Sequence, residues 1–262
     1  MALESYIKAR RRQRDVLLMT HIVIGYPDYG RSMQTVEAMV EAGVDLMELQ
    51  VPFSEPIADG PVILGANQRA LAGGMTVSGC LDFAGKCAQR FDIPFVIMSY
   101  YNILHRYGVA AFADRMSGLG LKGAIVPDLP PEEAREYLNA MDRACLDPIL
   151  LYSPNTSDER MAYLAEHARG FVYCVARPGV TGAATEFSEE LTEYLGRCRA
   201  ATELPLAVGL GIRDGKGMKY LRGKADIAIV GSHSIRTFDE QGTPGIRSLV
   251  QSLVAASAIG PP

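Results

Sequence analysis

The sequence predicts an α/β fold, a single (β/α)8 barrel over residues 1–262 with extra short helices. Three observations lead to this prediction. Eight short runs rich in Val, Ile, Leu and aromatic residues recur along the chain, helix-like segments separate them, and no linker-like stretch divides the sequence. A length of 262 residues is normal for one such barrel.

The eight runs are the predicted strands. Several lack clean alternation of polar and apolar residues, which is typical of parallel strands buried on both faces. In chain order they are LLMTHIVIG (17–25), LMELQVPF (46–53), FVIMSYY (95–101), GAIVPD (123–128), DPILLYSP (147–154), FVYCVAR (171–177), PLAVGLG (205–211) and IAIVGS (227–232). Their number alone also fits an open doubly wound sheet, but alternation with helices favours the barrel.

Between the runs, amphipathic segments predict helices. Residues 31–43 place apolar side chains at helical spacing and end at Gly43. The segment 130–144 begins with prolines and glutamates, which suit a helix N-terminus. The segment 157–170 begins with Ser157 as a capping residue and ends at Gly170.

Composition narrows the class of protein. The net charge of −4 argues against nucleic acid as a partner, and no apolar run reaches the length of a membrane span. The N-terminal residues carry basic side chains but no apolar signal core. The five cysteines form no C-x-x-C pair and resemble neither a zinc site nor a disulfide framework. We therefore expect a soluble cytoplasmic enzyme with reduced cysteines.

The second run carries the strongest chemical signal. Because side chains alternate along a strand, Glu48 and Gln50 share a face with Leu46, and this face points into the barrel mouth. Burial raises the pKa of a carboxyl group, which suits a general acid or base. Asp59 follows in the loop as a second carboxylate. The alternatives are a structural Glu48 held by backbone donors and an Asp59 that only makes a turn with Gly60.

Glycines at the last two strand ends predict an anion site. Gly209 and Gly211 end the seventh run, and Gly231 and Ser232 end the eighth. In such barrels these loops frequently bind phosphate, because glycines let backbone N–H groups approach an anion and a helix N-terminus adds positive charge. The segment ARPGVTGAA, with Arg177, Thr181 and Gly182, predicts a mobile loop over the same pocket. Ordinary turns are the alternative for the glycines.

Together these motifs resemble the tryptophan synthase α subunit family along nearly the whole chain. ELQVPFSEPIADGP (48–61) resembles the family's long signature, and RPGVTGA (177–183) resembles its sixth-strand loop. VGLGI (208–212) and VGSHSI (230–235) resemble its phosphate loops. YYN (100–102) and PDLPPEE (127–133) also fit the positions after the third and fourth strands.

The resemblance implies reversible retro-aldol cleavage of indole-3-glycerol phosphate to indole and glyceraldehyde 3-phosphate. It implies that Glu48 is the catalytic general acid/base and that Asp59 hydrogen-bonds the indole N–H. The phosphate would be held by Gly182, Gly211, Gly231 and Ser232, and the pocket would be lined by His21, Tyr100, Tyr173 and Thr181. No cofactor is needed in this chain, because a protonated indole ring is itself the electron sink, and no strand-end lysine offers a Schiff base.

The resemblance also implies a partner, the tryptophan synthase β subunit, in an αββα heterotetramer in which pyridoxal phosphate belongs to the β subunit. We expect no metal site, although His21 and His233 on neighbouring strands are the pair that would come nearest to one. A standalone indole-releasing lyase, a catalytically weak α-like activator of a β subunit and another phosphosugar barrel enzyme are the alternatives.

Three positions depart from the family pattern. Gln50 stands where the family has glycine, His21 where it usually has Phe, and Glu55 where it has Asp in the loop that meets the β subunit. Gln50 adds a polar side chain on the Glu48 face. We predict that Gln50 hydrogen-bonds near Glu48 and tunes its pKa, and that it does not point toward the outer helices.

Overall fold

In a computed structural model, which describes residues 2–176, 188–209 and 211–258, the chain forms a closed barrel of eight parallel strands. The strands follow one another in chain order, and β8 pairs with β1 to close the barrel. This confirms the predicted (β/α)8 architecture. The strands are β1 (Leu17–Val23), β2 (Leu46–Gln50), β3 (Phe95–Met98), β4 (Gly123–Ile125), β5 (Asp147–Tyr152), β6 (Val172–Val175), β7 (Leu206–Gly209) and β8 (Ile227–Val230).

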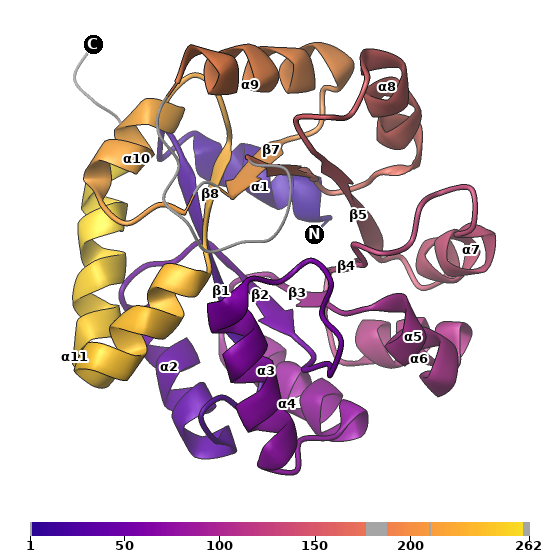
Figure 1. Cartoon of the computed structure of the whole chain (residues 1–262), viewed down its shortest axis with the longest axis vertical. Coiled ribbons are helices and arrows are strands. Elements are labelled where there is room, and N and C mark those ends of the chain that lie inside the picture. Colours follow the sequence, from indigo (N-terminus) through magenta and orange to yellow (C-terminus); the bar gives the residue numbers. More distant parts are fainter. Residues whose placement is uncertain (1, 177–187, 210, 259–262) are drawn as a thin grey trace.

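Helices surround the barrel as an outer ring, as Figure 1 shows. Two helices follow each of β2 and β3, so the expected extra helices are present. The helices are α1 (Leu3–Arg11), α2 (Tyr29–Glu41), α3 (Pro61–Ala72), α4 (Val77–Arg90), α5 (Tyr101–Tyr107), α6 (Val109–Gly118), α7 (Arg135–Arg143), α8 (Asp158–His167), α9 (Glu189–Ala201), α10 (Gly215–Leu221) and α11 (Ser232–Ala256). None of the described helices is long and apolar enough to cross a membrane.

The helix boundaries follow local chemistry. The Asp28 side chain caps α2 by accepting from Arg31 N, and Ser157 caps α8 as predicted. Gly43 follows α2 with φ +99°, a conformation that glycine adopts readily. The predicted start of α7 was wrong, because Glu133 N and Ala134 N bond to carbonyl oxygens three residues earlier and hold the prolines in a separate turn before the helix.

The core has two layers. One apolar cluster fills the barrel interior and includes Leu17, Met19 and Leu46, while a larger one lies between the strands and the helices. Leu3 and Ile7 of α1 belong to the interior cluster, so α1 closes the N-terminal end of the barrel. In Figure 1, α1 lies behind the strands. Apolar side chains fill this end of the barrel interior. We therefore expect the polar groups of a site at the opposite, C-terminal end.

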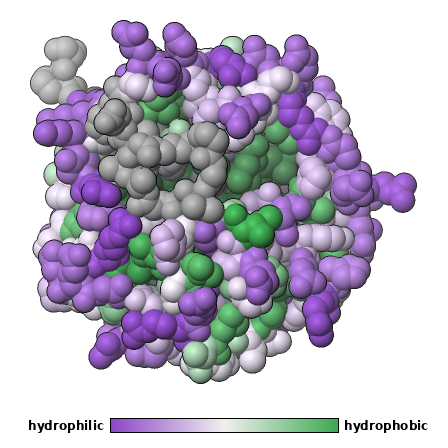
Figure 2. Space-filling model, in the orientation of Figure 1, coloured by the Kyte–Doolittle hydropathy of each residue, from purple (hydrophilic) through white to green (hydrophobic). Residues whose placement is uncertain are grey.

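Figure 2 shows the face of the molecule that is turned to the viewer in Figure 1. Hydrophilic residues form most of its periphery, and hydrophobic residues gather nearer the middle. An apolar centre within a polar rim is the usual setting of a small-molecule site.

Candidate active site

The candidate site starts from the pairing of β1 with β2. The parallel register places His21 beside Glu48 and Val23 beside Gln50. Leu46 lies in the interior cluster, whereas Met47, Leu49 and Val51 pack in the outer layer. Glu48 and Gln50 therefore face the barrel interior, as alternation along the strand predicts.

Glu48 is paired with an unexpected residue. Its Oε1 lies 3.1 Å from Nδ1 of His21, and both side chains are about 5% exposed. Burial, the largest single influence, would lower the pKa of His21, but Glu48, Asp59 and Gln50 together raise it above 6.5. When protonated, His21 gives the buried Glu48 a counter-charge.

Asp59 is held in the mouth by several donors. Its Oδ2 accepts from Gln50 Nε2 at 2.6 Å and from the Tyr100 hydroxyl at 3.1 Å. Burial raises the pKa of Asp59, while the bonds from Gln50 and Tyr100 and the nearby His21 act in the opposite direction. The role of Asp59 is therefore not limited to turn formation, because the loop returns its carboxylate to the barrel.

Gln50 points inward as predicted, but its amide bonds Asp59. Gln50 is fully buried, and its Nε2 also lies 3.5 Å from Asn67 Oδ1. Gln50 therefore belongs to a polar group with Asp59 and Asn67, and its amide nitrogen does not bond Glu48 directly. Strand alternation gives the direction of a side chain, but it does not specify which of two carboxylates the amide reaches.

Asn67 of α3 is a site residue that the sequence did not reveal. It is fully buried, accepts from Phe53 N at 2.9 Å, donates to Ile63 O at 2.9 Å and lies 3.5 Å from Asp59 Oδ2. It thus fixes the loop that carries Asp59 against α3. The sequence offers no clear signal for this role, because Asn67 is followed by the polar residues Gln68 and Arg69 and only the structure shows that it is buried.

The two predicted pocket tyrosines lie around the carboxylates. Tyr100 is 1% exposed, accepts from Ala58 N at 3.1 Å and stacks on Phe53 with ring centroids 5.2 Å apart. Tyr173 of β6 packs against the interior cluster. Its pKa is raised by burial and further by the charges of Glu48 and Asp59, so the hydroxyl keeps its proton as a donor.

Three of the four predicted phosphate residues, Gly211, Gly231 and Ser232, lie at the ends of β7 and β8 on the same side of the barrel. Gly211 has φ +64°, and Ser232 is the first residue of α11, directly after Gly231. A Cβ on Gly231 would lie 3.7 Å from His21 Cβ, so the start of α11 is beside His21, the partner of Glu48. Three residues assigned to the loop over the pocket, Arg177, Thr181 and Gly182, lie outside the described residues.

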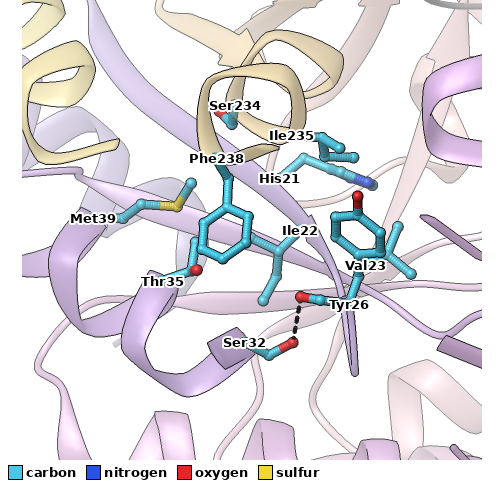
Figure 3. Close-up of a pocket in the computed structure, with 10 residues that line it drawn as sticks. All are labelled: His21, Ile22, Val23, Tyr26, Ser32, Thr35, Met39, Ser234, Ile235 and Phe238. Atoms are coloured by element: carbon cyan, nitrogen blue, oxygen red, sulfur yellow. Dashed lines mark hydrogen bonds between the residues drawn. The ribbon is translucent and has the colours of Figure 1, made fainter. Parts of the chain in front are cut away.

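A small pocket between β1, α2 and α11 shares His21 with the site and has room for about one water molecule. Figure 3 shows its lining: His21, Ile22, Val23, Tyr26, Ser32, Thr35, Met39, Ser234, Ile235 and Phe238. The ring nitrogen of His21 that is visible there is turned away from Met39 and Phe238. This pocket is too small for an aromatic phosphate ester, and none of its lining residues is a carboxylate.

Within the described ranges, no group of three or more His, Cys, Asp or Glu residues could hold a metal ion. His233 is half-buried, and its pKa is lowered by burial and by Arg213 and Arg236. The chemistry that the described mouth can perform is proton transfer by Glu48 and hydrogen bonding by Asp59 and the tyrosines.

Comparison with known proteins decides the family. The model of the tryptophan synthase alpha chain family matches residues 7–258. The chain belongs to the tryptophan synthase alpha chain family. It is 61% identical over 251 residues to the tryptophan synthase alpha chain of Desulforapulum autotrophicum, covering 96% of this chain and 99% of that one. With the alpha chain of Syntrophotalea carbinolica it shares 59% identity over 251 residues, again covering 96% and 99%.

Solved structures of this family agree with the fold. A Mycobacterium tuberculosis tryptophan synthase structure has a TM-score of 0.92 and 37% identity, covering 99% of this chain and all of that chain. A tryptophan synthase subunit alpha from Legionella pneumophila has a TM-score of 0.87 and 30% identity, with 97% of both chains covered. The family membership that the sequence motifs predict is therefore confirmed.

Proposed function

We propose that this tryptophan synthase alpha chain cleaves indole-3-glycerol phosphate reversibly to indole and glyceraldehyde 3-phosphate. The observation that supports this most directly is the pair of carboxylates, Glu48 and Asp59, which lie in one barrel mouth within the family's signature segment. The reaction is a lyase reaction that uses no cofactor in this chain.

Glu48 moves the protons in the proposed reaction. Protonation of the indole ring carbon that bears the side chain turns the ring into a cationic electron sink. A base then removes the proton from the adjacent glycerol hydroxyl, the carbon–carbon bond breaks, and its electron pair returns to the ring as indole forms. The ring carbon gains one proton and the glycerol hydroxyl loses one, so a single carboxyl group can first deliver a proton and then take one up. Glu48 Oε2 has no hydrogen-bond partner within the described part of the chain and suits this role.

Asp59 and the pocket residues act on the cation and on orientation. Asp59 would accept from the indole N–H, whose acidity rises as the ring becomes cationic, so this bond strengthens toward the transition state. Tyr100 holds Asp59 in place, and Tyr173 and His21 border the carboxylates. The sequence assigns Thr181 to the same pocket.

The phosphate group would bind at the start of α11. Gly231 and Ser232 lie at the N-terminus of α11, where the helix dipole favours an anion, and Gly211 contributes from the neighbouring β7 loop. Gly182 completes the proposed set from the loop after β6. These groups anchor a part of the substrate that does not react, and this binding energy orients the scissile bond against Glu48.

We also propose a β-subunit partner in an αββα heterotetramer located in the cytoplasm, with pyridoxal phosphate in the β subunit. In the loop that carries Asp59, Ile57 is 73% exposed, more than any other large apolar side chain among the described residues. Its neighbour Glu55 is exposed as well. A partner that covers Ile57 would also fix the position of the Asp59 loop, which links binding to catalysis.

An indole-release assay on the purified chain tests this function. We expect the wild-type chain to form indole and glyceraldehyde 3-phosphate in equal amounts, with a rate that rises on adding a β subunit. An increase of about 5- to 150-fold would correspond to an ordinary coupling energy between two sites. A chain that forms neither product in either condition contradicts the proposal. Full activity without the β subunit would favour a standalone lyase, and activation of the β subunit without cleavage would favour an activator.

A further inference from the structure

The barrel mouth contains three buried polar atoms without a hydrogen-bond partner in the described part of the chain: His21 Nε2, Glu48 Oε2 and Gln50 Oε1. They come from neighbouring positions on the adjacent strands β1 and β2. A buried polar atom without a partner costs free energy, so three in one place need a reason. The free Glu48 oxygen is the one left for the substrate, and the other two atoms remain to be explained.

The amide of Gln50 is oriented by the hydrogen bond of its nitrogen. Its Nε2 donates to Asp59 Oδ2 at 2.6 Å, so the carbonyl oxygen on the other side of the amide is the acceptor that stays available. Gln50 is also among the groups that raise the pKa of His21, so the two side chains lie near each other although neither free atom has a partner among the described residues. An acceptor near the imidazole has this effect because it stabilises the protonated ring.

The ring of His21 is held through its Nδ1 atom. Its Nδ1 lies 3.1 Å from Glu48 Oε1, which leaves Nε2 as the second donor of a protonated ring. The titratable groups that act on His21 are Glu48 from β2 and Asp59 from the following loop. On the α11 side its neighbours are Gly231, Ser234 and Ile235, which carry no titratable side chain.

We propose that His21 and Gln50 form a bridge, Glu48–His21–Gln50–Asp59, that positions the two catalytic carboxylates relative to each other. Protonated His21 donates to Glu48 through Nδ1 and to Gln50 Oε1 through Nε2, and Gln50 donates to Asp59. The bridge turns Glu48 Oε2 toward the substrate. His21 and Gln50 are positioning residues, and their effect on catalysis depends on the proposed cleavage reaction.

The bridge explains why two departures from the family pattern occur together. A phenylalanine at position 21 donates nothing to Gln50 or to Glu48, and a glycine at position 50 removes the link to Asp59. Each single replacement breaks the bridge at one end and leaves a polar group of the other residue unpaired. The two replacements together remove the whole bridge, so their effects are not additive.

The first test measures the histidines directly by NMR titration of the ring signals. The chain has four histidines, and the signal of His21 is the one lost in His21→Asn. We expect His21 to titrate above pH 6.5 in the wild type and at a lower pH in Gln50→Ala, where the acceptor is missing. His105→Phe, which removes an exposed histidine, is the control and should leave the His21 titration unchanged. A wild-type His21 that titrates at or below 6.5, or that ignores Gln50→Ala, overturns the bridge.

The second test measures indole release for His21→Phe, Gln50→Gly and the double variant. We expect each single variant to lose roughly 10- to 100-fold in kcat with KM nearly unchanged, as for a misplaced catalytic group. The double variant should lose no more than the worse single variant, and additive losses contradict the bridge. Wild-type kcat should fall on the alkaline side, because His21 loses the proton that it needs to donate to both neighbours. This fall should disappear in His21→Asn, which keeps a donor for Glu48 but never carries a charge. His21→Asn also serves if His21→Phe does not fold.

The two proposals fail in different ways. If the wild type shows the expected NMR titration but releases no indole, the cleavage reaction is wrong and the bridge stands as a structural feature. If the wild type releases indole but His21 is insensitive to Gln50, the bridge is wrong and the cleavage reaction stands.

Discussion

Replacing Glu48 with Gln is expected to reduce indole release from indole-3-glycerol phosphate by about 10²- to 10⁴-fold, the usual contribution of a general acid/base. The amide keeps the shape of the carboxylate and an oxygen that His21 Nδ1 can reach, but it cannot take up or deliver a proton. Substrate affinity should change little, because the proposed phosphate-binding groups at the start of α11 do not include Glu48. Single-turnover indole formation and KM measured on the same preparations check this.

Glu136→Gln is the matched control for this substitution. Glu136 is an exposed residue of α7, so the same loss of one negative charge there should leave kcat and KM unchanged. In Glu48→Gln the titration of His21 should also move to lower pH, since the charge that raises its pKa is gone. Equal cleavage by Glu48→Gln and the wild type would exclude Glu48 as the proton-transfer group.

The sequence predicts the position of Glu48 better than its surroundings. The barrel follows from eight runs alternating with helices, and the inward direction of Glu48 and Gln50 follows from the period of two along a strand. Both are local or periodic properties, which a single sequence carries. The resemblance to the family names the same carboxylates independently.

The partners of these side chains were less predictable for a physical reason. Whether Gln50 reaches Glu48 or Asp59 depends on how nine residues of loop return to the barrel, and no period encodes that path. Asn67 joins the site through a hydrogen bond to Phe53 N, which requires α3 to lie against the loop. The turn before α7 similarly depends on hydrogen bonds: the N–H groups of Glu133 and Ala134 bond to the carbonyl oxygens of Pro130 and Pro131.

Asp45→Ala is expected to cause the largest loss of stability, about 3–5 kcal/mol, because it leaves the buried Leu18 N–H and two partly buried arginines without their acceptor. The Asp45 side chain is fully buried at the N-terminal end of the barrel, directly before β2. It accepts from Arg10 Nε at 2.8 Å, Arg14 Nη1 at 2.9 Å and Leu18 N at 2.9 Å. One carboxylate thus ties α1 and the segment after it to β1 and β2. For a chain of this size the loss corresponds to a melting temperature lower by about 6–20 °C.

Asp82→Ala separates this effect from the loss of any ion pair. Asp82 is 54% exposed and pairs with Arg115, also at the surface, so its removal should cost at most about 1 kcal/mol.

Because Asp45 lies at the end of the barrel that α1 closes, away from Glu48, kcat of the folded Asp45→Ala protein should stay close to that of the wild type. Denaturant unfolding of both variants, with indole release measured well below the melting temperature, tests the two statements together. A loss for Asp45→Ala no greater than that for Asp82→Ala would mean that water or nearby groups compensate Arg10 and Arg14. A large fall in kcat with intact structure would mean that the two ends of the barrel are coupled through β1 and β2.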